Sequence, residues 1–519
     1  MNENIKDMEL IKRYPIFAIA SILYAVFYTV CLYENHSGIT FPLFTAGTIY
    51  YFYYCFKRLD VKLKKDSVVY MVGIELFGIS TCLTGDSFLI FMNKVAIFLL
   101  LISFLLHSCY EDGKWGFSKY TGAFFTTIVM AFGCIARPVT DMQAYRKSQG
   151  KEDDTAARTK LKYIMLGVAI SIPLVIVVMF LLVDADAIFA DCFEAVFGNV
   201  TLGETFYHVI TIALMIAIIF LFSYMLVAYL NQKTIREEVK DKATGEPIIA
   251  ITISTVLAVI YLIFSAIQIV YLFIGGATGV FSLPKGITYS MYAREGFFQL
   301  VFVCLLNLVI VLIGVYRFRE SRLLKIMLCI LTACTYVMIA SSALRMILYI
   351  QYQYLTFLRI FVLWLLFVIT LLMTGVLISI WKKDFPLFRY SMIVIGVCYL
   401  LLSFSRPDYW IAKVDTDNMK KETQYEFFSK ATPYKDTDYL SDFMSSDAAP
   451  VLITDAALEQ YPDYVMYDTG LYEQGKDPVK WRCFYIRRMD EKVADTGWRN
   501  WNLSRFIAKN MIGDYARPY

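Results

Sequence analysis

Charged residues are scarce in this chain: they make up 18% of 519 residues, whereas soluble globular chains carry about a quarter. Enzyme signatures are scarce too. The sequence has no glycine-rich phosphate-binding loop, no Gly-x-Ser-x-Gly nucleophile elbow and no His-Glu-x-x-His metal helix. With only 3 His and no Cys-x-x-Cys pair, it offers no ligand set for a structural metal. No cofactor and no enzyme class is therefore indicated, although an enzyme is not excluded.

Acidic and basic residues nearly balance, giving a net charge of +4, and most basic residues lie in short turns between apolar segments. We read them as determinants of membrane orientation, so no nucleic-acid partner is expected. The 11 Cys lie mostly in or beside apolar segments, where a thiol acts as a small hydrophobic group. Only Cys192 and Cys483 are expected to face an oxidising compartment, so at most one disulfide is predicted.

Apolar residues are abundant, at 58% of the chain. They fall in blocks of about 17 to 28 residues, which are long enough to cross a hydrocarbon layer of about 30 Å as helices. Many Tyr residues lie at the block ends, as expected at a membrane interface. About eleven spans are predicted, at residues 14–33, 39–56, 67–83, 88–107, 163–183, 204–230, 247–274, 297–316, 322–343, 356–380 and 387–404.

A twelfth apolar block, 119–135, is predicted not to span. Lys and Arg cluster in turns such as 136–162, 231–246 and 317–325, and short basic turns stay on the cytoplasmic side. If 119–135 crossed the bilayer, segment 136–162 would lie on the same side as turns that have no Lys or Arg. We therefore expect 119–135 to lie in the cytoplasmic interface, as an amphipathic or re-entrant helix.

The predicted fold is an all-α membrane protein, a polytopic helical bundle with one interfacial helix and a small extracytoplasmic C-terminal domain, α or α+β. The N-terminus is expected in the cytoplasm. Four segments are expected: an N-terminal four-helix membrane segment at 1–107, a basic cytoplasmic loop with the interfacial helix at 108–162, a seven-helix membrane core at 163–404 and the C-terminal domain at 405–519. The last is polar and long enough for a small fold. Within it, 438–447 and 502–511 read as helices and 482–489 as a strand.

Ionisable side chains inside apolar segments are costly and mark functional sites by default. Glu75 lies in the middle of its block, either as a proton or cation site or as a carboxyl held by hydrogen bonds for packing. Glu204 and His208 are four residues apart, so they share one helix face and are suited to relay a proton. One His and one carboxylate are too few for a zinc site. The functional and the structural interpretation of these residues both stay open.

Three sets of motifs lie in the second half of the chain. The first is Leu283-Pro-Lys-Gly-Ile-Thr-Tyr-Ser-Met-Tyr-Ala-Arg-Glu-Gly296; the second joins Ser341–Arg345 to Leu355–Arg359; the third joins Asp408–Ala412 and Asp438–Leu440 to Trp498–Arg505. Here the sequence resembles a bacterial membrane family known as domain of unknown function 4173, with its 4153 relatives. The resemblance implies a multi-pass membrane protein with an outer cap and tail, and supplies no activity, substrate or cofactor. It gives weight to an outer-surface motif made of Arg294, Glu295, Arg345, Arg359, Trp498, Arg499, Trp501 and Arg505.

The favoured function is non-enzymatic: a sensor, scaffold or assembly factor of the bacterial cytoplasmic membrane. Its partners would be the lipid bilayer and another membrane or cell-envelope protein, recognised by the tail and the 275–296 loop. A small-solute or ion transporter is the first alternative, with Glu75, Glu204 and His208 near its path. A membrane-embedded transferase acting on a lipid-linked substrate is the second, with Asp191 or Glu204 as its acid or base.

Overall fold

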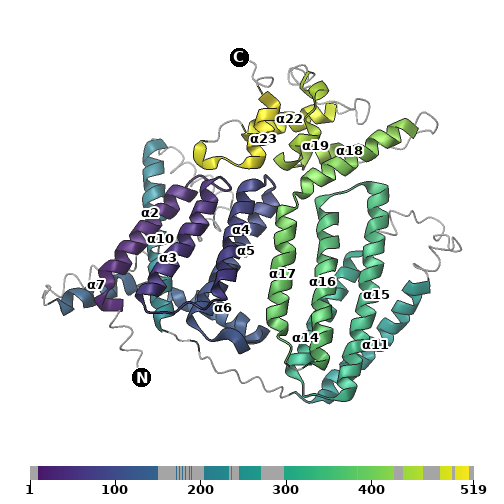
Figure 1. Ribbon diagram of the computed structural model, residues 1–519, viewed down its shortest axis with the longest axis horizontal. Helices are drawn as coiled ribbons and strands as arrows, with labels where there is room; N and C mark the ends of the chain where they lie inside the picture. The colour runs from purple at the N-terminus through teal and green to yellow at the C-terminus, as the bar shows by residue number, and fades with distance from the viewer. Residues whose placement is uncertain are drawn as a thin grey trace. The chain divides into compact units, whose positions relative to one another are not determined.

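A computed structural model gives the architecture of the protein (Figure 1). It describes residues 10–149, 204–232, 235, 245–270, 297–382, 384–425, 437–459, 480–493 and 497–513, with isolated positions between 167 and 189. Every regular element in these residues is a helix, and one isolated bridge joins Gly245 to Phe318. The all-α prediction is therefore confirmed over the described part of the chain.

Within the described ranges, 8 helices are long and apolar enough to cross a membrane. A helix is the structure expected of such blocks, because in lipid a segment must satisfy its own backbone groups. The eight are α2 (Tyr14–Leu32), α5 (Ser87–Cys109), α10 (Glu204–Gln232), α11 (Pro247–Gln268), α14 (Phe297–Arg317), α15 (Arg322–Gln353), α16 (Phe357–Trp381) and α17 (Leu387–Phe404). These are the helices of a multi-pass membrane protein.

Three predicted spans are not among the eight. α3 (Thr40–Arg58) is helical, but Thr and Tyr residues interrupt its apolar run. α4 (Ser67–Leu83) is apolar and 17 residues long. The predicted span 163–183 lies almost entirely outside the described residues. The total of about eleven spans therefore stays a prediction.

The block 119–135 forms α6 (Phe117–Phe132), and α7 (Arg137–Ser148) follows it at an angle of 61°. Pro138 stands near the start of α7, where its missing N–H is tolerated. A short turn separates the two helices, in which the Arg137 N–H donates to Cys134 O at 2.9 Å. This geometry suits a broken span or a re-entrant segment, and the interfacial placement of α6 stays a prediction.

The chain divides into two compact units, of which the first comprises Met1–Gly78, Ile97–Lys114 and Ser118–Glu237. Within it α2 packs against α3 and α10, and α7 packs against α2 and α10 (Figure 1). Basic residues gather where α2 begins and α3 ends, because Arg13 donates to Arg58 O and pairs with Asp60 at 3.8 Å. The rings of Tyr14 and Tyr145 lie 6.2 Å apart, so α7 lies at the same end.

The second unit comprises Ile79–Ala96, Trp115–Phe117 and Glu238–Tyr519. In it α15 packs against α11, α14 and α16, and α17 packs against α16 (Figure 1). Buried side chains at helical spacing, such as Leu324, Leu328 and Leu331 of α15, form its core. The helix directions place the basic turns after Arg317 and Trp381 at one end of this bundle and the C-terminal helices at the other (Figure 1).

The C-terminal helices are α18 (Pro407–Tyr425), α19 (Thr437–Asp442), α20 (Ala449–Leu452), α22 (Lys480–Val493) and α23 (Leu503–Ile512), with 3₁₀ turns η5 (Ser446–Ala448) and η6 (Trp498–Asn500). They share a core of buried residues that includes Ile411, Leu452 and Ile486. The predicted helix 502–511 corresponds to α23, whereas the predicted helix 438–447 is divided into α19 and the start of η5, with residues 443–445 between them. The independence of 405–519 as a domain stays a prediction.

The strand predicted at 482–489 is wrong, because this segment lies inside α22. Its short aromatic and β-branched run has the composition of a strand. The buried side chains nevertheless follow helical spacing: Cys483, Ile486, Met489 and Val493 recur every three or four residues, and each is at most 2% exposed. Burial of that face against the neighbouring helices outweighs the local β propensity.

Candidate functional site

The turn between α4 and α5, residues 84–86 in the second unit, is fitted closely to the C-terminal helices. Asp86 caps α5, since its Oδ1 accepts the N–H groups of Phe88 at 2.7 Å and Leu89 at 3.3 Å. Gly85 permits a close approach, because a Cβ at this position would lie 1.9 Å from Ser446 Oγ. A side chain here would displace the Ser446 hydroxyl, which lies 2.7 Å from Ser504 Oγ.

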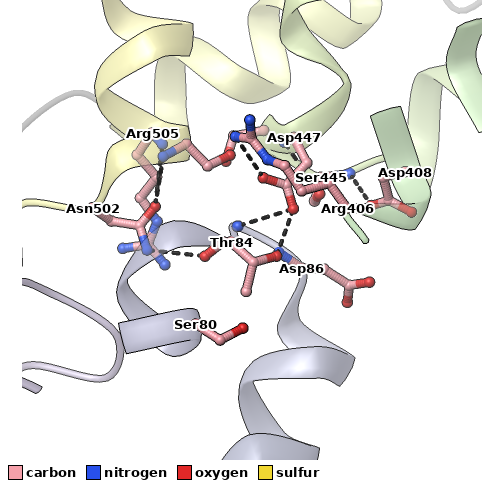
Figure 2. Close-up of polar contacts among 12 residues, drawn as sticks. Ser80, Thr84, Asp86, Arg406, Asp408, Ser445, Asp447, Asn502 and Arg505 are labelled. Atoms are coloured by element: carbon pink, nitrogen blue, oxygen red, sulfur yellow. Dashed lines mark hydrogen bonds and ion pairs between the residues drawn. The ribbon is translucent and has the colours of Figure 1, made fainter. Parts of the chain in front are cut away.

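Asp447 is the hub of the polar contacts at this turn (Figure 2). Its side chain is fully buried, and its Oδ2 accepts the Thr84 hydroxyl at 2.5 Å and the Gly85 N–H at 3.3 Å. Its Oδ1 lies 3.4 Å from Arg406 Nη2. Arg406 has a φ of 50°, in the left-handed region that non-glycine residues rarely adopt, at the junction of α17 and α18. Asp447 thus joins η5 both to the α4–α5 turn and to that junction.

Two more buried carboxyls lie in the same region, Asp86 and Asp408 (Figure 2). Asp408 Oδ2 accepts the Ser445 N–H at 2.9 Å. Burial, and then the charge of Asp86, raises the pKa of Asp408 to about 7. Burial also raises the pKa of Asp86, with a smaller contribution from the charge of Asp447. Because buried like charges resist full ionisation, this group holds a proton close to neutral pH. Asp86, Asp408 and Asp447 are termed the carboxylate cluster below.

Asn502 ties α23 to the same turn. Its Oδ1 accepts the N–H groups of Ser504 at 3.1 Å and Arg505 at 3.3 Å, which caps α23. Its Nδ2 donates to Thr81 O at 3.3 Å and to Thr84 O at 2.9 Å. Carbonyls at the end of a helix lack partners within that helix. One side chain therefore serves the end of α4 and the start of α23 (Figure 2).

A further buried polar group fixes α17 against residues 79–96. Asn93 Oδ1 accepts the hydroxyls of Tyr399 at 2.8 Å and Ser403 at 2.7 Å. Ser80 Oγ lies 2.6 Å from Ser403 Oγ. Such hydrogen bonds between helices in a membrane protein contribute about 0.6 to 2 kcal/mol each. The 79–96 hairpin is thus held by polar contacts both to α17 and to the C-terminal helices.

The cluster is arranged to join helices and to exchange a proton. Its oxygens accept backbone N–H groups at Asp86 and Asp408, and a hydroxyl and a guanidinium at Asp447. Among the residues that the structure describes, no group of three or more His, Cys, Asp and Glu side chains is placed to hold a metal ion. The cluster therefore links the α4–α5 turn to the C-terminal helices, and the raised pKa of Asp408 suits one of its carboxyls to proton uptake.

The predicted intramembrane residues lie in the first unit. Glu75 of α4 accepts a threonine hydroxyl from α3 at 2.8 Å. His208 Nδ1 lies 2.5 Å from the Tyr33 hydroxyl oxygen and 3.3 Å from Glu34 Oε1. Glu204 begins α10, and its side chain lies outside the described residues. A joint role of Glu204 and His208 therefore stays a prediction.

Two arginines of the predicted outer-surface motif are buried. Arg345 and Arg359 are 8% and 9% exposed. Arg345 donates to Gln268 Oε1 at 3.1 Å, and Arg359 donates to Tyr354 O at the end of α15. Both therefore hold helices of the second unit together and contribute little surface. The other two members from this half of the motif, Arg294 and Glu295, lie outside the described residues.

The tail part of that motif, 498–505, does reach the surface. Trp498 is 72% exposed and begins η6, the turn that also contains Arg499. The ring of Trp501 lies 5.8 Å from that of Phe506. Burial lowers the pKa of Arg505, which lies in the first turn of α23. The segment thus combines an exposed aromatic side chain with residues that anchor it.

Sequence reasoning did not identify the carboxylate cluster as a site. Local signals were present for two members: Asp86 stands in Gly-Asp-Ser ahead of an apolar run, an N-cap pattern, and Asp408 follows the Pro that begins α18. Nothing local pairs Asp447 with Thr84, which is 363 positions away. Only the folded chain shows that these residues meet.

Comparison with known proteins identifies the family without supplying an activity. No curated protein matches the chain, and no solved structure matches it. The family model described as Domain of unknown function (DUF4153) matches residues 71–454, a range that contains all three members of the carboxylate cluster. The resemblance to the 4153 relatives is therefore confirmed. Because the match covers well over half of its length, the chain belongs to the family Domain of unknown function (DUF4153).

Proposed function

We propose that the protein is a non-enzymatic sensor, scaffold or assembly factor of a bacterial cytoplasmic membrane. In this proposal the C-terminal helices form an extracytoplasmic surface that recognises another membrane or cell-envelope protein, and the N-terminus lies in the cytoplasm. A relationship to domain of unknown function 4173 belongs to the same proposal and rests on the motifs at 283–296, 341–359 and 498–505.

The orientation rests on charge. The turns that follow α14 and α16 carry Arg319 and Lys382, and Arg322 begins α15, all at the end of the second unit opposite the C-terminal helices. Short basic turns stay in the cytoplasm. The C-terminal helices are accordingly assigned to the outer side.

One observation carries the recognition proposal: a fully buried carboxylate, Asp447, holds the C-terminal helices to the α4–α5 turn while large aromatic side chains remain outside their core. Trp498 is 72% exposed and Phe443 is 71% exposed. Aromatic side chains on a fixed support are the usual anchors of protein interfaces, because they bury much area at little cost in conformational entropy.

Photo-crosslinking in cells tests the recognition surface. A photoreactive amino acid replaces Trp498 or Phe443 in the full chain, and Lys147 of α7 serves as the control position. We expect both outer positions to capture the same envelope protein, and Asp447→Ala to reduce that capture because the helices are no longer held. Adducts with lipid alone, or different proteins at the two positions, would overturn the proposal.

Thiol labelling tests the orientation separately. The cysteines for which the structure describes the surroundings are buried or half-buried, so their background reactivity is low. In intact cells a membrane-impermeant maleimide should label Phe443→Cys and spare Lys147→Cys. The reverse pattern would place the C-terminal helices in the cytoplasm and remove the proposed surface.

A further inference from the structure

A pocket in the first unit lies where α6 turns into α7, beside the end of α10. Its volume is about 490 Å³, within the range of about 300 to 1,000 Å³ that ligand pockets have in proteins. Polar and apolar groups share its walls. The lining residues are Thr126, Met130, Gly133, Cys134, Arg137, Tyr229 and Gln232.

The approach to this pocket is apolar and exposed. Phe125, Val129 and Phe132 of α6 recur at helical spacing and are 60%, 64% and 54% exposed. The ring of Phe132 lies 6.4 Å from that of Phe222 on α10, which is 40% exposed. In water such a stripe would be unfavourable, whereas in a bilayer it contacts acyl chains. The pocket therefore opens beside a lipid-facing surface.

The charge around the pocket is basic. α7 carries Arg137, Arg146 and Lys147 against one acid, Asp141. The same end of the unit holds Arg13 beside the end of α3. A pocket with mixed polar and apolar walls lies at the basic end of the unit and is bordered by an exposed apolar stripe. This arrangement matches the headgroup and the acyl chains of an anionic phospholipid.

We propose that this pocket binds the phosphate headgroup of an anionic phospholipid from the surrounding bilayer. Arg137 contacts the phosphate, Thr126 and Gln232 donate hydrogen bonds to its oxygens or to the glycerol, and the acyl chains lie along the stripe of α6. The proposal is independent of the recognition surface, since all the residues it uses belong to the first unit.

Asp141 positions Arg137 for this role. Arg137 Nη1 lies 3.4 Å from Asp141 Oδ1, and Asp141 Oδ2 accepts the Tyr224 hydroxyl at 3.0 Å. A guanidinium has five N–H donors in a planar fork, so one edge can pair with a carboxylate while another binds phosphate. The buried Asp141 therefore keeps the Arg137 guanidinium at the pocket wall and prevents it from extending into solvent.

Native mass spectrometry of the full-length protein tests the proposal. The purified chain is titrated with phosphatidylglycerol, with phosphatidylcholine or with inorganic phosphate. We expect one phosphatidylglycerol to bind more tightly than phosphatidylcholine, and Arg137→Gln to weaken that binding about tenfold, as for one charge-assisted hydrogen bond. Lys65→Gln, which removes an exposed charge that is neither in the pocket lining nor on α7, should change the affinity less than about twofold.

A second variant separates the pocket from the fold. Thr126→Phe adds a large ring to the pocket lining at an exposed position and leaves Arg137 and Asp141 in place. It should therefore also weaken phosphatidylglycerol binding, with little change in melting temperature. The proposal would be overturned by equal binding of the two lipids, by equal effects of Arg137→Gln and Lys65→Gln, or by undiminished binding to Thr126→Phe. So would displacement of the lipid by millimolar inorganic phosphate, which would indicate a site for a soluble anion.

Discussion

Replacement of Asp447 is the most direct perturbation of the carboxylate cluster. Asp447→Ala removes the acceptor of the Thr84 hydroxyl and the Gly85 N–H inside a buried turn. Asp447→Asn keeps the shape and one oxygen for these donors, but it presents an amide N–H₂ group to Arg406. We therefore expect both variants to loosen the C-terminal helices, and the alanine variant to loosen them more.

The size of each effect depends on the hydrogen bonds and the ion pair that the variant removes. A hydrogen bond to a charged group contributes about 1.5 to 3 kcal/mol. The Arg406 side chain is 34% exposed, so its ion pair is screened by water and contributes about 1 kcal/mol or less. The expected loss in the free energy of opening is about 3 to 5 kcal/mol for Asp447→Ala and about 1 to 2 kcal/mol for Asp447→Asn.

Cys483 is a natural reporter of this opening. This residue is 2% exposed and lies in the core of the C-terminal helices, so a maleimide reaches its thiol only when the helices separate. Because about 1.4 kcal/mol is a tenfold change in an equilibrium constant, labelling should accelerate about 100-fold or more in Asp447→Ala and about 5- to 30-fold in Asp447→Asn. The rate is measured by peptide mass spectrometry on the full chain in lipid nanodiscs.

Asp455→Asn is the matched control, because Asp455 is exposed in the segment that follows α20. Its replacement should leave the Cys483 labelling rate unchanged. If Cys483 in Asp447→Ala were labelled no faster than in this control, the claim that Asp447 holds the C-terminal helices to the α4–α5 turn would be refuted.

Three further predictions concern Asp408, Asn502 and Glu75. Burial raises the pKa of Asp408 from 3.8 to about 7, so the folded state binds the proton more tightly and stability falls as pH rises between these values. Cys483 labelling, corrected with a model thiol, should therefore be faster at pH 8 than at pH 6. Asp408→Asn should reduce this difference, and the buried Asp86 would account for any that remains. Asn502→Ala removes a cap and two donated hydrogen bonds, so we expect it to lower the stability by about 2 to 3 kcal/mol and to accelerate the labelling of Cys82. Asn502→Asp retains the cap and should lower the stability less. Glu75→Gln keeps an acceptor for its hydrogen bond and should change stability by less than about 1 kcal/mol; a loss of ion or solute flux in proteoliposomes without unfolding would instead favour the transporter alternative.

Apolar length predicted the membrane helices well. The block 387–404 coincides with α17, and the block 297–316 ends one residue before α14 does. These boundaries are predictable because an apolar run and its flanking polar residues are local features of the sequence. The segment 482–489 could not be predicted in this way, because a run of this length is compatible with both a strand and a helix. Only the structure shows which of its side chains are buried.

The carboxylate cluster could not be predicted from the local sequence, for a different physical reason. A buried polar group needs a partner, but the sequence around Asp447 does not say which one. Thr84, Gly85 and Arg406 come from segments far apart in the chain. Arg345 is a similar case: it was predicted on an outer surface, whereas it donates to Gln268 within the bundle.

The apolar and polar contacts of the C-terminal helices have different roles. Burial of residues such as Leu452 and Ile486 favours association but is non-directional, so it tolerates helices that shift along one another. The Asp447 contacts are satisfied only when η5 meets the α4–α5 turn, because any shift leaves a buried carboxylate without donors. We infer that the hydrophobic core supplies most of the free energy of association and that the carboxylate cluster selects one position of the helices. Because burial raises the pKa of Asp408 to about 7, we expect the contacts that fix this position to weaken as pH rises toward that value.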